Sequence, residues 1–176
     1  MEDQSDFTKI ERLLNRILEK AHTSDEESQK DPSRWKKHSI LYGAKNSFLF
    51  EKTNHRFPNL GISSINSDGT HFIYLYSKPQ DHKYPANFFI PCSSKHRENG
   101  CYISPYKALI SDVSEPFSFM HKTYIVFQII FPLAYESNDN KMLSLMGVVK
   151  ESDIENYHLI KAYHKNRQGK NKTGYR

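Results

Sequence analysis

Residues 124–131 read YIVFQIIF, and this run is the strongest strand signal in the chain. Branched and aromatic side chains favour extended backbone, and Gln128 is the only non-aromatic polar interruption. A strand that is apolar on both faces is typical of the centre of a sheet. The apolar segment 142–149 follows across the polar loop 137–141, so we expect these two segments to pair as antiparallel neighbours.

Shorter apolar runs surround this strand. Residues 60–65 and 70–76 flank the turn sequence NSDG and predict a hairpin whose second strand places Phe72, Tyr74 and Tyr76 on one face. Short apolar runs lie at 39–42 and 48–50, and further strands are expected at 88–90 and 101–103. A brief helix is expected after Ser104, and a final helix is expected to open with the capping-box sequence SDIE at 152–155. These elements predict an α+β fold with a mixed, mostly antiparallel sheet, an N-terminal amphipathic helix, a C-terminal helix and a disordered basic tail.

The first 22 residues have the pattern of an amphipathic helix. Phe7, Ile10, Leu14 and Ile17 recur at three- and four-residue steps, with charged residues on the other faces. Residues 23–34 read TSDEESQKDPSR and contain no apolar residue to bury, which predicts a flexible linker. The helix is therefore either a docking segment for a protein partner or the first element of the fold.

Net charge is concentrated at the other end of the chain. The 176 residues carry a net charge of +5 and are long enough for a single domain, which we place at 35–164. The segment 165–176 has no acidic residue and holds five positive charges, so the net charge of the rest of the chain is zero. We expect this segment to be a disordered tail that binds nucleic acid, serves as a nuclear import signal or only solubilises the protein. Its basic residues are Lys165, Arg167, Lys170, Lys172 and Arg176.

The chain shows none of the usual signatures of a targeting segment or of a catalytic site. No stretch approaches the roughly 20 apolar residues that span a bilayer, and the first 20 residues are charged throughout, so a nuclear or cytoplasmic protein that is neither secreted nor membrane-bound is expected. Phosphate-binding glycine loops, zinc-protease helices and nucleophile elbows are missing, and the nine histidines are scattered. We therefore predict no catalytic residue, no metal and no cofactor, although a triad assembled in space stays possible.

Two cysteines lie on either side of a polar loop. Cys92, His96 and Cys101 are spaced too loosely, and are one ligand too few, for a structural zinc site. A single cysteine pair in a chain without a secretory signal usually stays reduced. Two thiols beside an ordinary polar loop are expected.

Two segments carry a resemblance to a known family. Residues 100–104, GCYIS, followed by the strand 123–131, TYIVFQIIF, resemble PARP-type ADP-ribosyltransferase domains, nearest to the inactive pseudo-PARP domain of TASOR-like chromatin-silencing proteins. The resemblance implies a degenerate nucleotide cleft in which Tyr42 and Gly43 replace the His-Gly pair of active members and Tyr102 corresponds to the tyrosine that stacks on nicotinamide. The catalytic glutamate of the family has no confident match. The resemblance thus implies a pseudoenzyme.

Three hypotheses of function follow. The first is a non-catalytic nuclear adaptor or scaffold, with a degenerate ADP-ribosyltransferase-like fold as one option, that binds a protein partner through the first helix and nucleic acid through the tail. The second is a β-rich module that binds single-stranded nucleic acid through Phe72, Tyr74 and Tyr76. The alternative for these three residues is that the same face is buried in the core. The third is an active transferase or nuclease.

Overall fold

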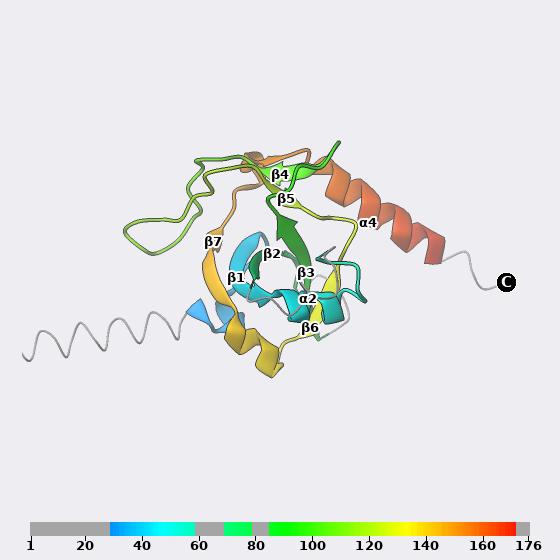
Figure 1. The fold of residues 1–176 in the computed structure, drawn as a ribbon, viewed down its shortest axis with the longest axis horizontal. Helices are drawn as coiled ribbons and strands as arrows, with labels where there is room; N and C mark the ends of the chain where they lie inside the picture. Colours follow the sequence, from blue (N-terminus) through cyan, green and yellow to red (C-terminus); the bar gives the residue numbers. More distant parts are fainter. Residues whose placement is uncertain (1–28, 59–68, 79–84, 172–176) are drawn as a thin grey trace, which may run out of the picture.

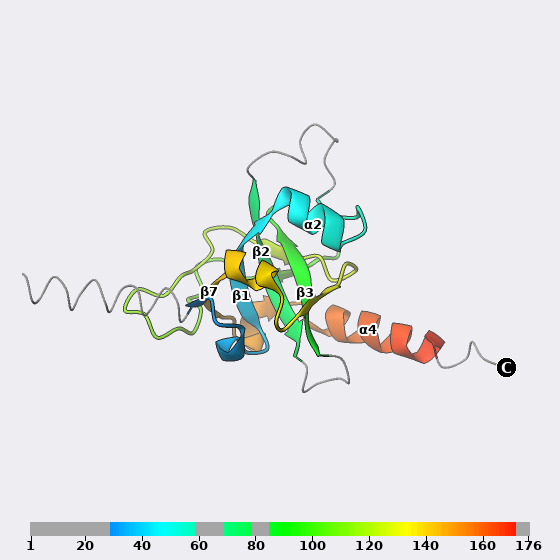
Figure 2. The ribbon, with the colours of Figure 1, turned by 90° about the horizontal axis from the view of Figure 1, so that it is seen from below.

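The computed structural model describes residues 29–58, 69–78 and 85–171, with the backbone alone for 167–171. The fold is α+β: an antiparallel sheet curls around itself, and the helices α2 (Asn46–Lys52) and α4 (His158–Asn171) lie at its periphery (Figures 1 and 2). No helix in these ranges is long and apolar enough to cross a membrane. The predicted N-terminal helix and the strand expected at 60–65 lie outside the described residues.

The remaining elements are short. They are η1 (Pro32–Arg34), β1 (Ser39–Lys45), β2 (Thr70–Ser77), β3 (Ala86–Ser93), β4 (Cys101–Ile103), β5 (Thr123–Ile125), β6 (Phe131–Ala134), η3 (Asn138–Met142), β7 (Ser144–Val148), η4 (Glu151–Asp153) and β8 (Ile154–Glu155).

The strands are arranged in the order β7-β1-β2-β3-β5-β4-β8, with β6 paired to β3. The connection between β4 and β5 reaches back to β7. There the Ile110 N–H donates to the Val148 carbonyl at 2.8 Å, and the Val148 N–H donates to the Ile110 carbonyl at 2.9 Å. The outer edge of β7 is therefore partly covered, which limits its pairing with another chain.

Two apolar clusters occupy the two faces of the sheet, and β2 contributes to both. Ile73 and Leu75 belong to the first cluster, which α2 covers through Phe48 and Leu49. Tyr74 belongs to the second cluster, which Ile160 of α4 joins, and Phe72 and Tyr76 pack against it. The predicted alternation along this strand is confirmed, but both faces are buried.

The run 124–131 is not one continuous strand. Its ends form β5 and β6, and both lie along the same side of β3: Ile125 pairs with Cys92, and Phe131 pairs with Phe89. Between these pairs, five residues (126–130) oppose only two residues of β3 (90–91). Three extra residues must therefore leave the ladder, which makes 126–130 a large bulge. We call this segment the 126–130 bulge.

Other details of the prediction were wrong. Residues 142–149 contribute β7, which pairs with β1 rather than with 124–131. The chain after Ser104 makes a turn and not a helix. The SDIE sequence does not cap a helix, because its Ile154 and Glu155 form β8 against Tyr102 and Ile103.

The structure describes parts of the two segments expected to be flexible. Asp31 caps η1 within the linker by accepting the Ser33 N–H at 2.9 Å. Helix α4 continues to Asn171, inside the segment expected to be a disordered tail.

Candidate functional site

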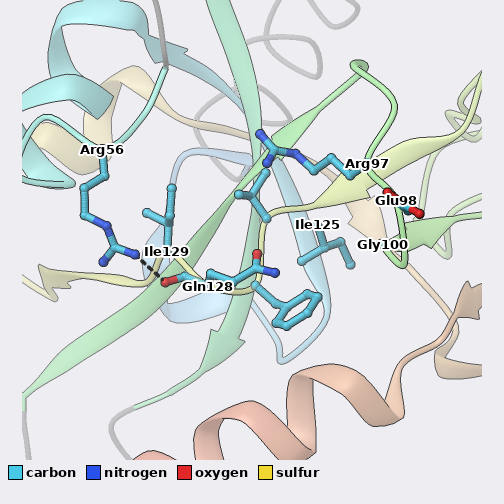
Figure 3. A pocket seen from close by; sticks show the side chains of 9 residues that line it. Arg56, Arg97, Glu98, Gly100, Ile125, Gln128 and Ile129 are labelled. Carbon is cyan, nitrogen blue, oxygen red and sulfur yellow. Dashed lines mark hydrogen bonds between the residues drawn. The ribbon is translucent and has the colours of Figure 1, made fainter.

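A pocket of about 450 Å³ lies at the 126–130 bulge (Figure 3). Its size is within the range of about 300–1,000 Å³ that is usual for small-molecule sites. The bulge is fixed by backbone hydrogen bonds, from the Val126 N–H to the Pro91 carbonyl and from the Ile129 N–H to the Val126 carbonyl, both at 2.9 Å. The lining residues are Arg56, Arg97, Glu98, Gly100, Ile125, Val126, Phe127, Gln128 and Ile129.

Arg56 reaches the pocket from the loop that follows α2. One of its guanidinium nitrogens donates to the Gln128 carbonyl at 3.0 Å. The loop itself is held by the buried Thr53 hydroxyl, which donates to the Leu49 carbonyl at 2.6 Å and accepts the Phe57 N–H at 2.9 Å. The guanidinium is therefore positioned by a fixed backbone although its side chain is exposed.

Arg97 reaches the same pocket from the loop between β3 and β4. The Gly100 N–H donates to the Arg97 carbonyl at 3.1 Å and closes this loop. A Cβ atom at Gly100 would lie 2.7 Å from the Tyr124 ring and 2.9 Å from the Arg97 carbonyl oxygen. Only glycine fits this close approach, so the loop is packed directly against β5.

An aromatic and basic group adjoins the pocket on the outer face of β4 and β5. Tyr102 and Tyr124 are directly opposite each other in the ladder, with ring centroids 5.6 Å apart. The Lys122 ammonium lies 4.6 Å from the centroid of the Tyr102 ring, within the range of a cation–π contact. His96 Nδ1 lies 3.0 Å from the Tyr124 hydroxyl. The Tyr124 ring lies close against Gly100, which lines the pocket, so this group adjoins the pocket.

Helix α4 packs against the other side of the bulge. The Tyr163 hydroxyl donates to the Gln128 carbonyl at 3.5 Å, and the Tyr163 ring is 5.6 Å from the Phe127 ring. The same carbonyl thus accepts from both Arg56 and α4. The helix then continues through Lys165, which is exposed, and through the positions of Arg167 and Lys170. The predicted nucleic-acid-binding residues Lys172 and Arg176 lie outside the described residues.

The structure does not bring the predicted cleft residues together. Tyr42 and Gly43 are on β1, and three strands separate β1 from β4, where Tyr102 lies. Tyr42 instead packs on Phe72, with ring centroids 4.8 Å apart, and accepts a hydrogen bond from the Thr70 hydroxyl. Gly43 has a φ of +113°, and a Cβ there would lie 2.2 Å from the Met142 carbonyl oxygen. Its role is therefore close backbone packing.

The aromatic face of β2 is core and not an exposed platform. Tyr74 is fully buried (0% exposed), and its hydroxyl lies 2.6 Å from His38 Nδ1. Burial raises the pKa of Tyr74 far above its ordinary value and lowers the pKa of His38, so the hydrogen bond joins an uncharged hydroxyl to a neutral imidazole. Phe72 and Tyr76 are partly buried against the same cluster.

The two cysteines are free and buried. Both pair with Ile125, from opposite sides of β5, so a strand lies between them. Two strand spacings amount to about 9–10 Å, beyond the roughly 7 Å limit between the Cα atoms of a disulfide. Burial raises the pKa of Cys101 to about 12 and that of Cys92 still further. Within the described ranges, no group of three or more His, Cys, Asp or Glu side chains is placed to hold a metal ion.

The sequence analysis missed Arg56, Arg97 and Lys122 as site residues. It noted Gln128 as the polar interruption of an apolar run, which was the one visible sign of a bulge. The two arginines stand in short loops beside Asn54 and Asn99, both of which have left-handed backbone with φ near +50°. Asparagine is enriched in left-handed backbone, so its presence is a weak signal for such a loop.

The predicted partner-binding residues lie outside the described residues. These are Phe7, Ile10, Leu14 and Ile17. The chain matches no protein-family model, no curated protein and no solved structure.

Proposed function

We propose that the protein is a binding module for single-stranded nucleic acid, and that it binds through the outer face of β4 and β5 and the adjoining bulge. The observation that carries the proposal is the Lys122 ammonium over the Tyr102 ring, next to a pocket lined by two arginines. We call Arg56, Arg97, Tyr102 and Lys122 the basic-aromatic surface.

The chemistry of this surface suits a single strand. Proteins that bind single strands without sequence preference combine cations that follow the phosphates with rings on which bases stack. Tyr102 is half-buried, so one part of its ring is fixed by the sheet while Lys122 lies over another part. The Lys122 side chain is exposed and flexible, and its ammonium can move to a phosphate when a base takes its place on the ring.

Positive charge outnumbers negative charge around the site. Three members of the basic-aromatic surface are cations, against the carboxylate of Glu98 in the pocket lining and that of Glu155, which accepts the Ser104 hydroxyl at 3.3 Å. Helix α4, which contacts the bulge through Tyr163, continues into the basic segment as far as Asn171, and the segment 165–176 is the one predicted to bind nucleic acid. Attraction between such a surface and phosphates is sensitive to salt, because binding releases counterions.

The adaptor part of the hypothesis rests on the first helix. Docking of a protein partner through Phe7, Ile10, Leu14 and Ile17 stays a prediction, as do the nuclear location and the resemblance to pseudo-PARP domains. In this proposal the protein would hold a nucleic acid on the outer face of β4 and β5 and a protein at the N-terminal end of the chain.

Fluorescence anisotropy with a labelled single-stranded oligonucleotide tests the proposal. Tyr102→Ala is expected to weaken binding by about 5- to 150-fold, the loss of one stacked base. The control is Tyr106→Ala, because Tyr106 is an exposed tyrosine (72%) that lies on the connection between β4 and β5, outside the site. Equal losses in both variants, or no binding by the unmodified protein at any salt concentration, would contradict the proposal.

A further inference from the structure

The two arginines of the pocket come from loops that are far apart in the sequence and enter the pocket from different sides (Figure 3). Arg56 is oriented by the Gln128 carbonyl, and Arg97 by the loop that Gly100 closes. The exposed Gln128 side chain also lines the pocket and adds a neutral hydrogen-bonding group. Guanidinium groups form paired hydrogen bonds to phosphate oxygens, so two of them in one pocket predict a phosphate ligand.

The charge of the pocket distinguishes two kinds of phosphate. The loop containing Arg97 and Glu98 borders one side and the loop containing Arg56 borders another, with the bulge between them. The Glu98 carboxylate points away from the Arg97 guanidinium (Figure 3). A terminal phosphomonoester carries about −1.5 to −2 charges at neutral pH, against one for a diester, and matches two guanidinium groups better.

We infer that this pocket is a subsite for the terminal phosphomonoester of a bound single strand. The inference rests on the proposed function and names the class of nucleic acid that binds best: strands with a phosphorylated end. The base next to that end would stack on Tyr102, since Gly100 of the pocket and Tyr102 are only two residues apart.

The test compares three oligonucleotides of one sequence with the full chain: one with a 5′-phosphate, one with a 3′-phosphate and one with hydroxyl groups at both ends. The label is placed internally. Affinity for one of the phosphorylated strands is expected to exceed that for the hydroxyl-ended strand by about tenfold, the contribution of one or two added charge-assisted hydrogen bonds. The quantity to report is this affinity ratio, because a general loss of binding leaves it unchanged.

Arg56→Gln and Arg97→Gln are each expected to bring the ratio close to one. Lys95→Gln is the matched control, because Lys95 is an exposed cation on the same loop as Arg97 but does not line the pocket. Equal affinities for all three strands, or a ratio that stays at its original value in both arginine variants, would overturn the inference and leave the proposed function standing. Failure of every strand to bind would instead overturn the proposed function.

Discussion

Replacing Tyr74 by alanine is expected to destabilise the whole domain rather than to remove a binding surface. The ring is fully buried among the apolar side chains of the second cluster. Truncating a buried aromatic ring to alanine costs about 3–5 kcal/mol. The variant also loses the 2.6 Å hydrogen bond to His38, which contributes about 1 kcal/mol. The sum, about 4–6 kcal/mol, is comparable to the total stability of many small domains.

Tyr74→Phe separates the two contributions. It keeps the ring and removes only the hydroxyl, so the cost is that of a partly buried imidazole nitrogen left without its hydrogen-bond partner, about 1–3 kcal/mol. Urea denaturation of the full-length chain measures both variants, and anisotropy with the same oligonucleotide measures their binding. We expect the order of stability to be unmodified protein, then Tyr74→Phe, then Tyr74→Ala, with the affinity of Tyr74→Phe unchanged. A Tyr74→Ala variant that keeps its unfolding free energy and loses its affinity would refute this reasoning, because it would show that the ring is an exposed platform.

Three further predictions concern packing, pH and the thiols. Gly43→Ala is expected to lower the unfolding free energy by more than about 2 kcal/mol, since the new Cβ would meet the Met142 carbonyl and the backbone is in a region that side chains avoid; an unchanged urea midpoint would disprove this. Burial lowers the pKa of His38 below its ordinary value of 6.5, so the unfolded chain takes up this proton first as the pH falls. The His38 contribution to stability is thus complete above about pH 6.5 and is lost progressively below it. A His38→Gln variant should therefore show a weaker decline in urea midpoint between neutral and mildly acid pH than the unmodified protein. An identical decline in both proteins would exclude His38 as its source. Cys92 and Cys101 are expected to resist iodoacetamide at neutral pH in the folded protein and to react in urea, as intact mass will show; rapid labelling of the folded protein would contradict their burial.

Much of the sheet could be predicted from local pattern. The strand at Cys101–Ile103 was predicted with the bounds that the structure has, and the runs at 39–42, 70–76 and 142–149 fall on β1, β2 and β7. Alternation along β2 predicted its two faces, because successive side chains of a strand point in opposite directions. Strand pairing could not be predicted in the same way, since the backbone N–H and C=O groups of β7 could form hydrogen bonds equally well with β1 or with the run 124–131.

The run 124–131 shows why the site was missed. A run of apolar residues reports burial, and it does not report whether the backbone stays in the ladder. Val126 and Ile129 are buried in the first cluster and Ile125 and Phe127 in the second, so both cores are filled although the chain leaves β3 between them. The SDIE sequence fails for a similar reason, because its residues make a better partner for the exposed edge of β4 than a helix start.

The candidate site depends on contacts between distant segments. Arg56, Arg97 and Lys122 look like ordinary surface residues in the sequence, and only the fold places them around the bulge and the Tyr102 ring. Tyr102 was singled out by the resemblance, but the structure gives it Lys122 and Tyr124 as neighbours and leaves Tyr42 three strands away.

Titration of the ¹⁵N-labelled full-length chain with a single-stranded oligonucleotide, followed by amide chemical shifts, tests the role of the basic-aromatic surface most directly. We expect the largest shifts at Arg97, Gly100, Tyr102, Lys122 and Gln128, with the amides of β1 and β2 unchanged. Shifts confined to β1 and β2, or to the connection between β4 and β5, would contradict the assignment of this face as the nucleic-acid-binding site.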